Sequence, residues 1–338
     1  MKISLITKYI PNDKNASQKA PLDVERIIEE EYDVKKERVY KVNIKYIRNI
    51  ESMIRCIIAN MKYRKNCVSI VQWPLMVGKP LKNSNFCNSA TYKIALIHDI
   101  DSIRFCNEDK KACEIEINEL NKFDVVITHN QCMTQWLNKN GFNKNVVELE
   151  LFDYLSDYSK LQEQNIKDYS IVFAGNLQKS IFLRNISQVV KSKMNLYGNL
   201  PDYELDQNII YKGSFSPDEL CEHIEGSFGL IWDGETTQTC GGINGYYMMF
   251  NNPHKLSLYM ACGLPVITWR RAAISNFIEK NKVGFVVDDL SEIDFILEQL
   301  SLDEYNKMCA NVNKIREKVC KGYYTKTAIK KALELVVK

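Results

Sequence analysis

Short runs of apolar residues alternate with longer amphipathic segments along the chain. In the first half, the apolar runs fall at residues 3–7, 68–71, 94–97 and 124–128. Two segments between them, Leu22 to Glu30 and Ile47 to Met61, have apolar residues at helical spacing. In the second of these, the spacing places on one face Ile50, Ile54 and Ile58. This alternation is typical of strands joined by crossover helices in a parallel sheet, so the first half predicts a Rossmann-like domain.

The alternation restarts after a polar stretch from Asp157 to Asp168, which has the composition of a linker. Six strand-like runs follow it, at residues 170–173, 195–197, 209–211, 229–232, 266–268 and 284–287. A last amphipathic segment, Tyr324 to Val336, is expected to pack back onto the first domain. We therefore predict an α/β protein with two Rossmann-like domains, at residues 1–156 and 169–320, and a C-terminal helix within 321–338. Two such domains predict a cleft between them, where ligands meet the carboxyl ends of the strands.

Composition narrows the class of protein. The 338 residues include 45 Lys and Arg and 42 Asp and Glu, and the net charge of +3 is spread along the chain, so we expect no nucleic-acid partner. The 11 cysteines are odd in number and form no C-x-x-C pair, which favours reduced thiols over disulfides or a zinc site. The first strand begins at Lys2 and no apolar run reaches the ~20 residues of a membrane span. These features predict a cytoplasmic protein and leave open a peripheral membrane contact and a homo-oligomer.

The segment from Asn251 to Ile267 reads as a loop, a helix, a glycine turn and a strand. Free backbone N–H groups and the positive end of the helix dipole make the start of this helix an anion site, and Lys255 adds a cation suited to a diphosphate. We expect the anion to contact the turn formed by Asn252, Pro253, His254, Lys255, Leu256 and Ser257. The alternative is that His254 and Lys255 are ordinary surface residues on a capped helix.

A second candidate phosphate contact lies where the strand at Phe173 runs into a glycine turn. Gly175 and Asn176 let the backbone approach a ligand, and Lys179 follows in position to meet phosphate oxygens. The alternative is a plain strand-to-helix turn capped by Asn176. Tyr211, at the end of another strand, is a candidate for stacking on a base or lining the nucleotide pocket, although a tyrosine there also suits packing.

The segment from Asn251 to Ile267 resembles the helix that binds the sugar donor in GT-B glycosyltransferases, and we call it the donor helix. Together with several other motifs, it resembles in particular the subfamily of bacterial adhesin glucosyltransferases and β-1,6-galactofuranosyltransferases. The other motifs are Gln72-Trp73-Pro74-Leu75, His98 to Arg104, Thr128-His129-Asn130, Phe152-Asp153-Tyr154, Phe173 to Leu177 and Gly229 to Gly234. The resemblance covers nearly the whole chain. It implies two facing Rossmann-like domains and transfer of a sugar from a nucleotide diphosphate carrier.

The resemblance also assigns roles at the N-terminus and on the donor helix. It places a loop of the acceptor domain against the donor phosphates, with Ser17 and Lys19 as contacts, although a solvated loop is an alternative. Many retaining members carry a glutamate on the donor helix where this chain has Leu258. That departure, with the resemblance to β-linking enzymes, favours an inverting transfer.

An inverting transfer needs a base to take the proton of the acceptor hydroxyl. We expect it among His98, Asp99 and Asp101, which follow the strand at 94–97, with Asp99 as the first choice. Each could instead be a structural cap or a partner of Arg104. His129 and Asn130 are candidates for holding the acceptor.

A loop after another strand, from Trp232 to Tyr247, is rich in glycine and is expected to close over the donor, with Asp233 on sugar hydroxyls. Asp99 and Asp101 have D-x-D spacing but lie in the predicted acceptor domain, so we expect no metal and no cofactor. The leading interpretation is a hexosyltransferase that moves glucose or galactofuranose from a UDP-sugar to a glycan or glycoprotein. The alternatives are a non-catalytic GT-B-like partner or chaperone of another transferase, and a nucleotide-sugar epimerase.

Overall fold

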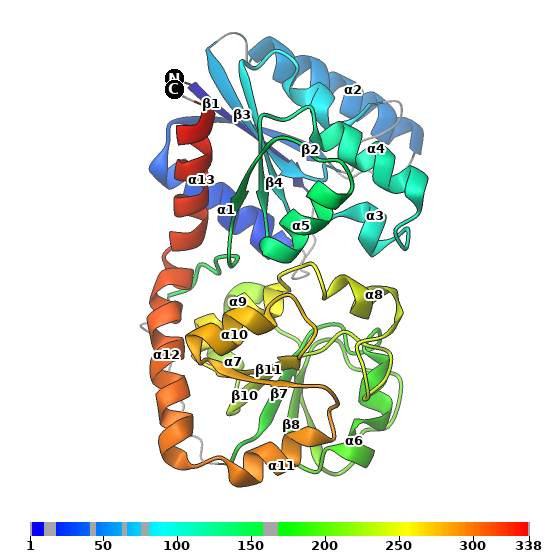
Figure 1. Cartoon of the computed structure of the whole chain (residues 1–338), viewed down its shortest axis with the longest axis vertical. Coiled ribbons are helices and arrows are strands. Elements are labelled where there is room, and N and C mark those ends of the chain that lie inside the picture. Colours follow the sequence, from blue (N-terminus) through cyan, green and yellow to red (C-terminus); the bar gives the residue numbers. More distant parts are fainter. Residues whose placement is uncertain are drawn as a thin grey trace. The chain divides into compact units, whose positions relative to one another are not determined.

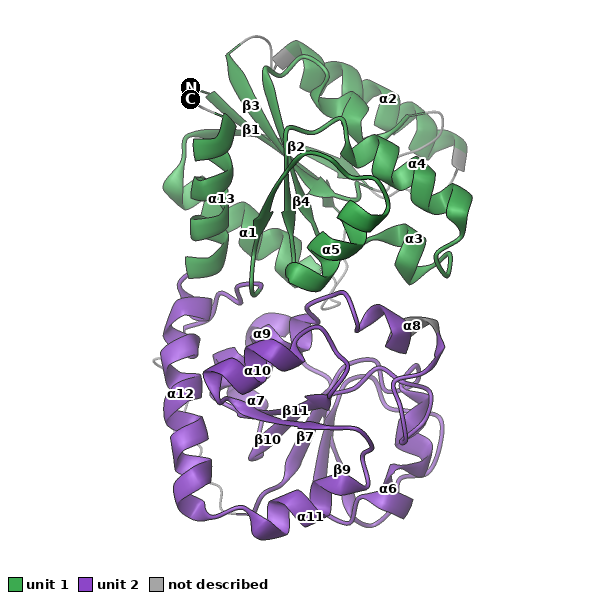
Figure 2. Cartoon of the chain, in the orientation of Figure 1, with its two compact units in different colours: residues 1–151, 322–338 green, residues 152–321 purple. Residues whose placement is uncertain are grey.

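The computed structural model describes residues 2–9, 18–40, 45–62, 66–75, 81–157 and 168–336. Helices and strands alternate along the chain (Figure 1). They form two compact units, one from residues 1–151 with 322–338 and the other from residues 152–321 (Figure 2). The division at residue 151 lies a few residues before the expected linker, most of which falls outside the described residues. Each unit holds one six-stranded parallel sheet, which confirms the predicted α/β class.

The sheet of unit 1 has the strand order β2-β1-β3-β4-β5-β6. Its strands are β1 (Lys2–Tyr9), β2 (Val34–Tyr40), β3 (Cys67–Trp73), β4 (Tyr92–Ile97), β5 (Val125–Thr128) and β6 (Asn145–Glu148). Four were predicted, whereas β2 and β6 were not. These two are the edge strands, so a charged run such as that of β2 is tolerated there and gives no apolar signal.

Helices cover both faces of this sheet. They are α1 (Lys19–Glu31), α2 (Lys45–Lys62), α3 (Asp101–Arg104), α4 (Lys110–Leu120), α5 (Gln131–Lys139) and α13 (Tyr323–Val336), with a 3-10 turn η2 (Asn83–Cys87). The C-terminal helix α13 packs on α1 and on β5, within unit 1. On α1, which overlaps the predicted helix from Leu22 to Glu30, the apolar residues Val24, Ile27 and Ile28 are buried. The helices α2 and α4 lie on the other side of the sheet (Figure 1).

The helix α2 differs from the expectation. Its apolar residues Ile50 and Ile54 are 60% and 52% exposed, so the face that looked like a core face is turned to solvent. The buried side of the helix carries Ser52 and Ala59 instead. The periodicity identified the helix and its apolar face correctly, but packing decides which face meets the sheet.

The sheet of unit 2 has the strand order β12-β11-β10-β7-β8-β9. Its strands are β7 (Ile171–Ala174), β8 (Met194–Tyr197), β9 (Ile209–Gly213), β10 (Phe228–Ile231), β11 (Val266–Trp269) and β12 (Gly284–Val287). All six were predicted. The strands β7, β8, β10 and β11 are buried throughout, and strands buried on both faces read as near-continuous apolar runs. The edge strands β9 and β12 are only partly buried but still contain short apolar runs. The strand order reverses at β7, which has β8 on one side and β10 on the other. In a parallel sheet, the crevice beyond the carboxyl ends of the strands at such a reversal is the usual ligand site.

The helices of unit 2 surround this sheet. They are α6 (Ile186–Val189), α7 (Pro217–His223), α8 (Gly242–Tyr247), α9 (His254–Cys262), α10 (Ser275–Asn281), α11 (Glu292–Gln299) and α12 (Leu302–Cys320), with a 3-10 turn η4 (Ile181–Asn185). The helix α9 packs on β10, with α7 and α12 against it, and every residue from Leu256 to Cys262 is buried. Packing on these elements within the core of unit 2 fixes the position of α9. Among the helices of the described residues, none is long and apolar enough to cross a membrane.

Candidate active site

The start of α9 has no side-chain cap. Pro253 is the N-cap residue, and no side chain forms a capping hydrogen bond there. Ser257, in the first turn, is fully buried, and its hydroxyl has no hydrogen-bond partner among the described residues. At its other end the helix closes on Gly263 in the left-handed conformation (φ 80°). The N-terminal turn therefore combines the positive end of the helix dipole with a buried hydroxyl that makes no other bond among these residues.

Lys255 joins this turn to the point where the strand order reverses. Its ammonium group lies 2.6 Å from Oδ1 of Asp233, and Asp233 comes two residues after β10. The Lys255 side chain is 17% exposed and that of Asp233 is 34% exposed. The ion pair thus sits at the carboxyl end of β10, beside the end of β7. The geometry brings together Lys255 and Asp233, which are 22 residues apart in the chain.

Gly175, directly after β7, makes room for the lysine. A Cβ atom at this position would lie 3.0 Å from Cε of Lys255. The Lys255 ammonium group also lies 4.6 Å from the centre of the Phe173 ring, a cation–π contact that holds the side chain in place. Gly175 therefore leaves the space that Lys255 crosses, and its predicted approach to a ligand stays a prediction.

The other residues predicted near the phosphates have different surroundings. Asn176 accepts the backbone N–H of Lys179 at 3.1 Å through Oδ1, as in a capped turn, and Lys179 is exposed. Tyr211 lies on the edge strand β9, where its hydroxyl donates to the carbonyl of Gly198 at 2.9 Å. The strand β8 lies between β9 and β7, so Tyr211 is not on a strand next to the end of β7, where Lys255 lies.

His254 is packed among aromatic side chains of unit 2. Its ring stacks on Tyr154 at 5.2 Å between ring centres and meets Phe152 edge-on at 6.3 Å. Asn252 and Leu256 are buried, and the backbone N–H of Leu256 donates to the carbonyl of Pro253 at 2.9 Å. These contacts show how His254 and its neighbours pack, and the anion contacts predicted for this turn stay predictions.

The two N-terminal predictions fall in different places. Ser17 lies outside the described residues. Lys19 is the first residue of α1 and not part of a loop, and its ammonium group pairs with Asp23 at 2.9 Å with both side chains buried. The pairing occurs because the two residues are one helical turn apart.

The three candidate bases follow β4 in unit 1. Nε2 of His98 lies 2.7 Å from Oε1 of Gln72, which belongs to the neighbouring strand β3. Asp99 accepts a hydrogen bond from the guanidinium of Arg104. Asp99 is thus a partner of Arg104, which is the alternative role that the sequence left open for it.

Asp101 has a different environment, at the start of α3. Burial, and then the negative charges of Glu116 and Asp99, raise the pKa of the Asp101 carboxyl to about 6. The carboxylate of Glu116 is anchored by N–H groups, accepting from the Asp101 backbone at 3.1 Å, the Ser102 backbone at 2.8 Å and Trp73 Nε1 at 3.1 Å. A carboxyl group with its pKa near 6 suits proton transfer at neutral pH.

His129, after β5, is fully enclosed. Its Nε2 lies 3.1 Å from the carbonyl oxygen of Ile97, and burial lowers the pKa of its imidazole to about 4. The ring is therefore neutral at physiological pH. Asn130 caps α5 by accepting the backbone N–H of Met133 at 3.0 Å. The contact between His129 and Ile97 joins the ends of the neighbouring strands β5 and β4.

Two contributors to the site had no local signal in the sequence. The Lys255–Asp233 pair and the effect of Glu116 on Asp101 both depend on tertiary contacts. The loop from Trp232 to Tyr247, which was expected to close over the donor, includes the helix α8, and within it Trp232 Nε1 donates to the carbonyl of Thr236 at 2.9 Å. In the part of the chain that the structure describes, no three His, Cys, Asp or Glu residues gather as a metal site.

Comparison with known proteins identifies the family to which this chain is similar. Residues 3–151 match the N-terminal domain model of the glucosyltransferase 3-like proteins, and residues 171–332 match their C-terminal domain model. The chain is 32% identical over 249 residues to the β-1,6-galactofuranosyltransferase WbbI of Escherichia coli, covering 71% of each chain.

Solved structures show the same GT-B fold. The lipopolysaccharide outer core galactosyltransferase WaaB has a TM-score of 0.61 at 11% identity, over 98% of this chain and 100% of that one. A trehalose-6-phosphate structure from E. coli bound with UDP-2-fluoro glucose has a TM-score of 0.61 at 7% identity, over 100% and 99% of the two chains. The fold, the matched domains and the identity together show that this chain belongs to the glucosyltransferase 3-like family of GT-B glycosyltransferases.

Proposed function

We propose that the protein transfers a hexose, glucose or galactofuranose, from a UDP-sugar to a hydroxyl group of a glycan or glycoprotein, with inversion at the anomeric carbon. The observation that carries the proposal is the Lys255–Asp233 pair at the start of α9, at the point where the strand order of unit 2 reverses. A cation, a helix dipole and a carboxylate in one region suit a nucleotide diphosphate sugar.

In the proposed complex, the diphosphate takes the ammonium group of Lys255 from Asp233. The phosphate oxygens also receive the N–H groups of the first turn of α9 and the hydroxyl of Ser257, which has no other partner among the described residues. Asp233 is then available to accept hydrogen bonds from sugar hydroxyls. The UDP-2-fluoro glucose bound to the trehalose-6-phosphate protein supports a UDP carrier through a shared fold.

The choice of two sugars rests on the relatives. The matched family is named for glucosyl transfer, and WbbI is a galactofuranosyltransferase. The glycan or glycoprotein acceptor follows from the resemblance of the sequence to adhesin glucosyltransferases and β-1,6-galactofuranosyltransferases.

For the base, we propose Asp101 in place of our first choice, Asp99. The carboxylate of Asp99 already accepts from Arg104, whereas the raised pKa of Asp101 makes it the better proton acceptor. In the reaction, the acceptor oxygen forms a bond to the anomeric carbon as the bond from that carbon to the diphosphate oxygen breaks. The hydroxyl proton passes to Asp101, and UDP leaves with the electron pair. We propose that Lys255 and the start of α9 stabilise the departing charge without a metal.

The test is to incubate the protein with UDP-glucose or UDP-galactofuranose, with and without a panel of glycan acceptors, and to follow both UDP release and acceptor mass. We expect one donor to be consumed in an acceptor-dependent way, and Lys255→Ala to abolish consumption while Lys280→Ala, an exposed lysine on α10, does not. Donor consumption without any acceptor would favour the epimerase alternative. Binding of UDP-sugar with no turnover on any acceptor would favour the non-catalytic partner.

A further inference from the structure

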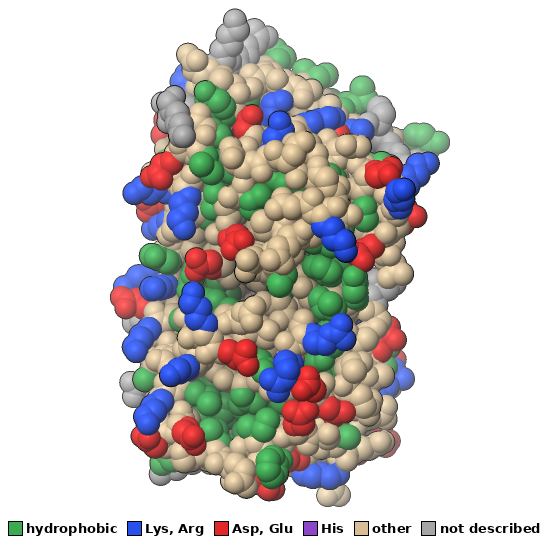
Figure 3. Space-filling model, in the orientation of Figure 1, with side chains coloured by type: hydrophobic (Ala, Val, Ile, Leu, Met, Phe, Trp, Pro, Cys, Tyr) green, Lys and Arg blue, Asp and Glu red, His purple; other side chains and the backbone are tan. Residues whose placement is uncertain are grey.

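The helix α2 presents a continuous apolar stripe to solvent. Seven large side chains at helical spacing form it, which we call the α2 stripe. Their exposures are Tyr46 79%, Ile47 50%, Ile50 60%, Met53 49%, Ile54 52%, Ile57 58% and Met61 63%. The positions repeat every three or four residues, so they share one face of the helix. Figure 3 shows hydrophobic side chains along the upper right edge of unit 1, where α2 lies in Figure 1.

The opposite side of α2 is fixed to unit 1 by polar contacts. Arg55 pairs with Glu37 of β2 at 3.0 Å. The side-chain amide of Asn60 donates to the carbonyl of Asn85 at 2.7 Å, and Glu51 accepts the backbone N–H of Tyr40 at 3.2 Å. These bonds determine which face of α2 is turned to unit 1. The α2 stripe is exposed because it lies on the other face of the helix.

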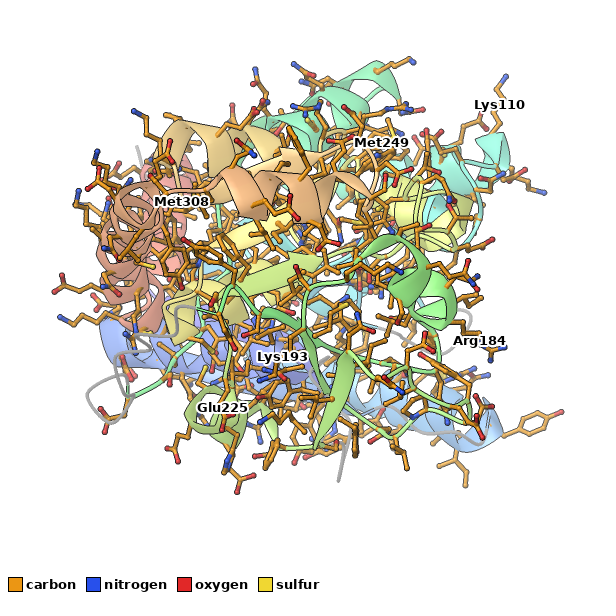
Figure 4. All side chains as sticks on the ribbon, turned by 90° about the horizontal axis from the view of Figure 1, so that it is seen from below. Lys110, Arg184, Lys193, Glu225, Met249 and Met308 are labelled. Atoms are coloured by element: carbon orange, nitrogen blue, oxygen red, sulfur yellow. The ribbon has the colours of Figure 1, made fainter. Side chains whose placement is uncertain are left out.

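A neighbouring helix shows the usual arrangement. On α4, Ile117 and Leu120 are buried, whereas Lys110 projects away from the ribbon (Figure 4). Long charged side chains elsewhere, such as Arg184, also point outward (Figure 4). The α2 stripe departs from this pattern because apolar side chains occupy the outward face.

The size of the stripe exceeds that of an ordinary surface patch. At about 200 Å² for each large side chain and exposures from 49% to 79%, the seven residues present on the order of 800 Å² to solvent. The largest apolar patch on a typical monomer is about 300–600 Å², and larger patches mark a partner or a membrane.

The charge around the stripe selects its occupant. The basic residues are less evenly spread than we expected: residues 41–65 contain seven Lys and Arg and one acidic residue, Glu51, which is a net charge of +6. The whole chain carries +3, so the remainder carries −3. A basic amphipathic helix with an exposed apolar face is suited to an anionic lipid surface. Two copies meeting through this helix would bring two +6 segments together, which like-charge repulsion disfavours.

We propose that α2 docks the protein on the surface of an anionic phospholipid bilayer. The α2 stripe enters the boundary between headgroups and acyl chains, and the basic residues of the segment other than Arg55, which is paired with Glu37, attract the lipid phosphates. With four basic residues and one acidic residue between Lys45 and Lys62, the helix lies in the surface and does not span it. This inference is independent of the proposed transfer reaction, because a chain without transferase activity would still bind.

The experiment is sedimentation of the whole protein with vesicles of phosphatidylcholine alone or mixed with phosphatidylglycerol. We expect binding to the mixed vesicles that weakens as salt is raised. The triple variant Ile50→Glu/Ile54→Glu/Ile57→Glu should lose at least about tenfold in partition coefficient. The matched control is Phe295→Glu on α11 of unit 2, where the side chain is 67% exposed, and it should bind as the wild type does.

Three results would overturn the proposal. The wild type could fail to bind either vesicle, the triple variant could bind as strongly as the wild type, or the wild type could be a dimer in solution that the triple variant converts to a monomer without any vesicle binding. The last result would assign the stripe to a second copy. The single variant Ile50→Ser, at a 60% exposed position, and thermal unfolding followed by circular dichroism separate loss of docking from loss of fold.

Discussion

The ammonium group of Lys255 lies 2.6 Å from Oδ1 of Asp233, at the carboxyl ends of the strands where the order of the unit 2 sheet reverses. In the proposed complex, a phosphate oxygen of the donor takes the hydrogen-bonding position that this carboxylate occupies. The ion pair holds the cation in a partly buried place.

The role of Asp233 can be separated from that of Lys255. We expect Asp233→Asn to bind UDP at least as tightly as the wild type, because a competing negative charge beside the phosphates is removed. The same variant should lose about 1 kcal/mol or more of the additional affinity for UDP-sugar, because an accepting carboxylate is lost from the sugar. Calorimetric titrations with UDP and with UDP-sugar measure both effects. Weaker binding of UDP itself would show that Asp233 serves only to position Lys255.

The proposed base is tested through pH. With the pKa of Asp101 at about 6, kcat/KM should rise as the pH increases through 6 and level off above it, since only the ionised carboxylate accepts the proton. Asp101→Asn should lower kcat by about 10²–10⁴ and leave the donor affinity nearly unchanged. Asp99→Asn is the comparison, and a larger loss of kcat for that variant would return the role to Asp99.

The neutral state of His129 links stability to pH. Its pKa is lowered to about 4 in the folded protein, against an ordinary value of 6.5, so the unfolded chain takes up a proton first as the pH falls. The stabilisation is present above pH 6.5 and is lost as the pH falls towards 4, by about 3 kcal/mol. Urea unfolding of the wild type and of His129→Gln across this range tests the link. Parallel pH dependence of the two proteins would contradict it.

Metal dependence is tested with a chelator. Because we assign stabilisation of the leaving diphosphate to Lys255 and the start of α9, turnover should be nearly unchanged after treatment with EDTA. Loss of turnover that magnesium or manganese restores would mean that the D-x-D spacing of Asp99 and Asp101 serves a metal.

The sequence was informative where one segment alone determines the structure. Strands buried on both faces, such as β7 and β10, are unbroken apolar runs, and the proline and glycine around α9 mark both its ends. The position of Lys255 at the start of this helix followed from the same local signals.

The remaining features depend on contacts between distant segments. Nothing near Lys255 in the chain indicates Asp233 as its partner, and nothing near Asp101 indicates Glu116. The periodicity of α2 revealed an apolar face, but the polar contacts of Arg55 and Asn60 determine that this face points to solvent. The charged edge strand β2 gave no apolar pattern, because an edge strand need not be buried.

The central claim is that the diphosphate of a UDP-sugar binds Lys255 at the start of α9. Calorimetric titration of UDP into the wild type, Lys255→Ala and the control Lys280→Ala measures this most directly. We expect Lys255→Ala to lose about 1.5–3 kcal/mol, roughly tenfold to a hundredfold in affinity, while Lys280→Ala binds as the wild type does. An unchanged affinity for UDP in a folded Lys255→Ala protein would show that the diphosphate does not bind Lys255.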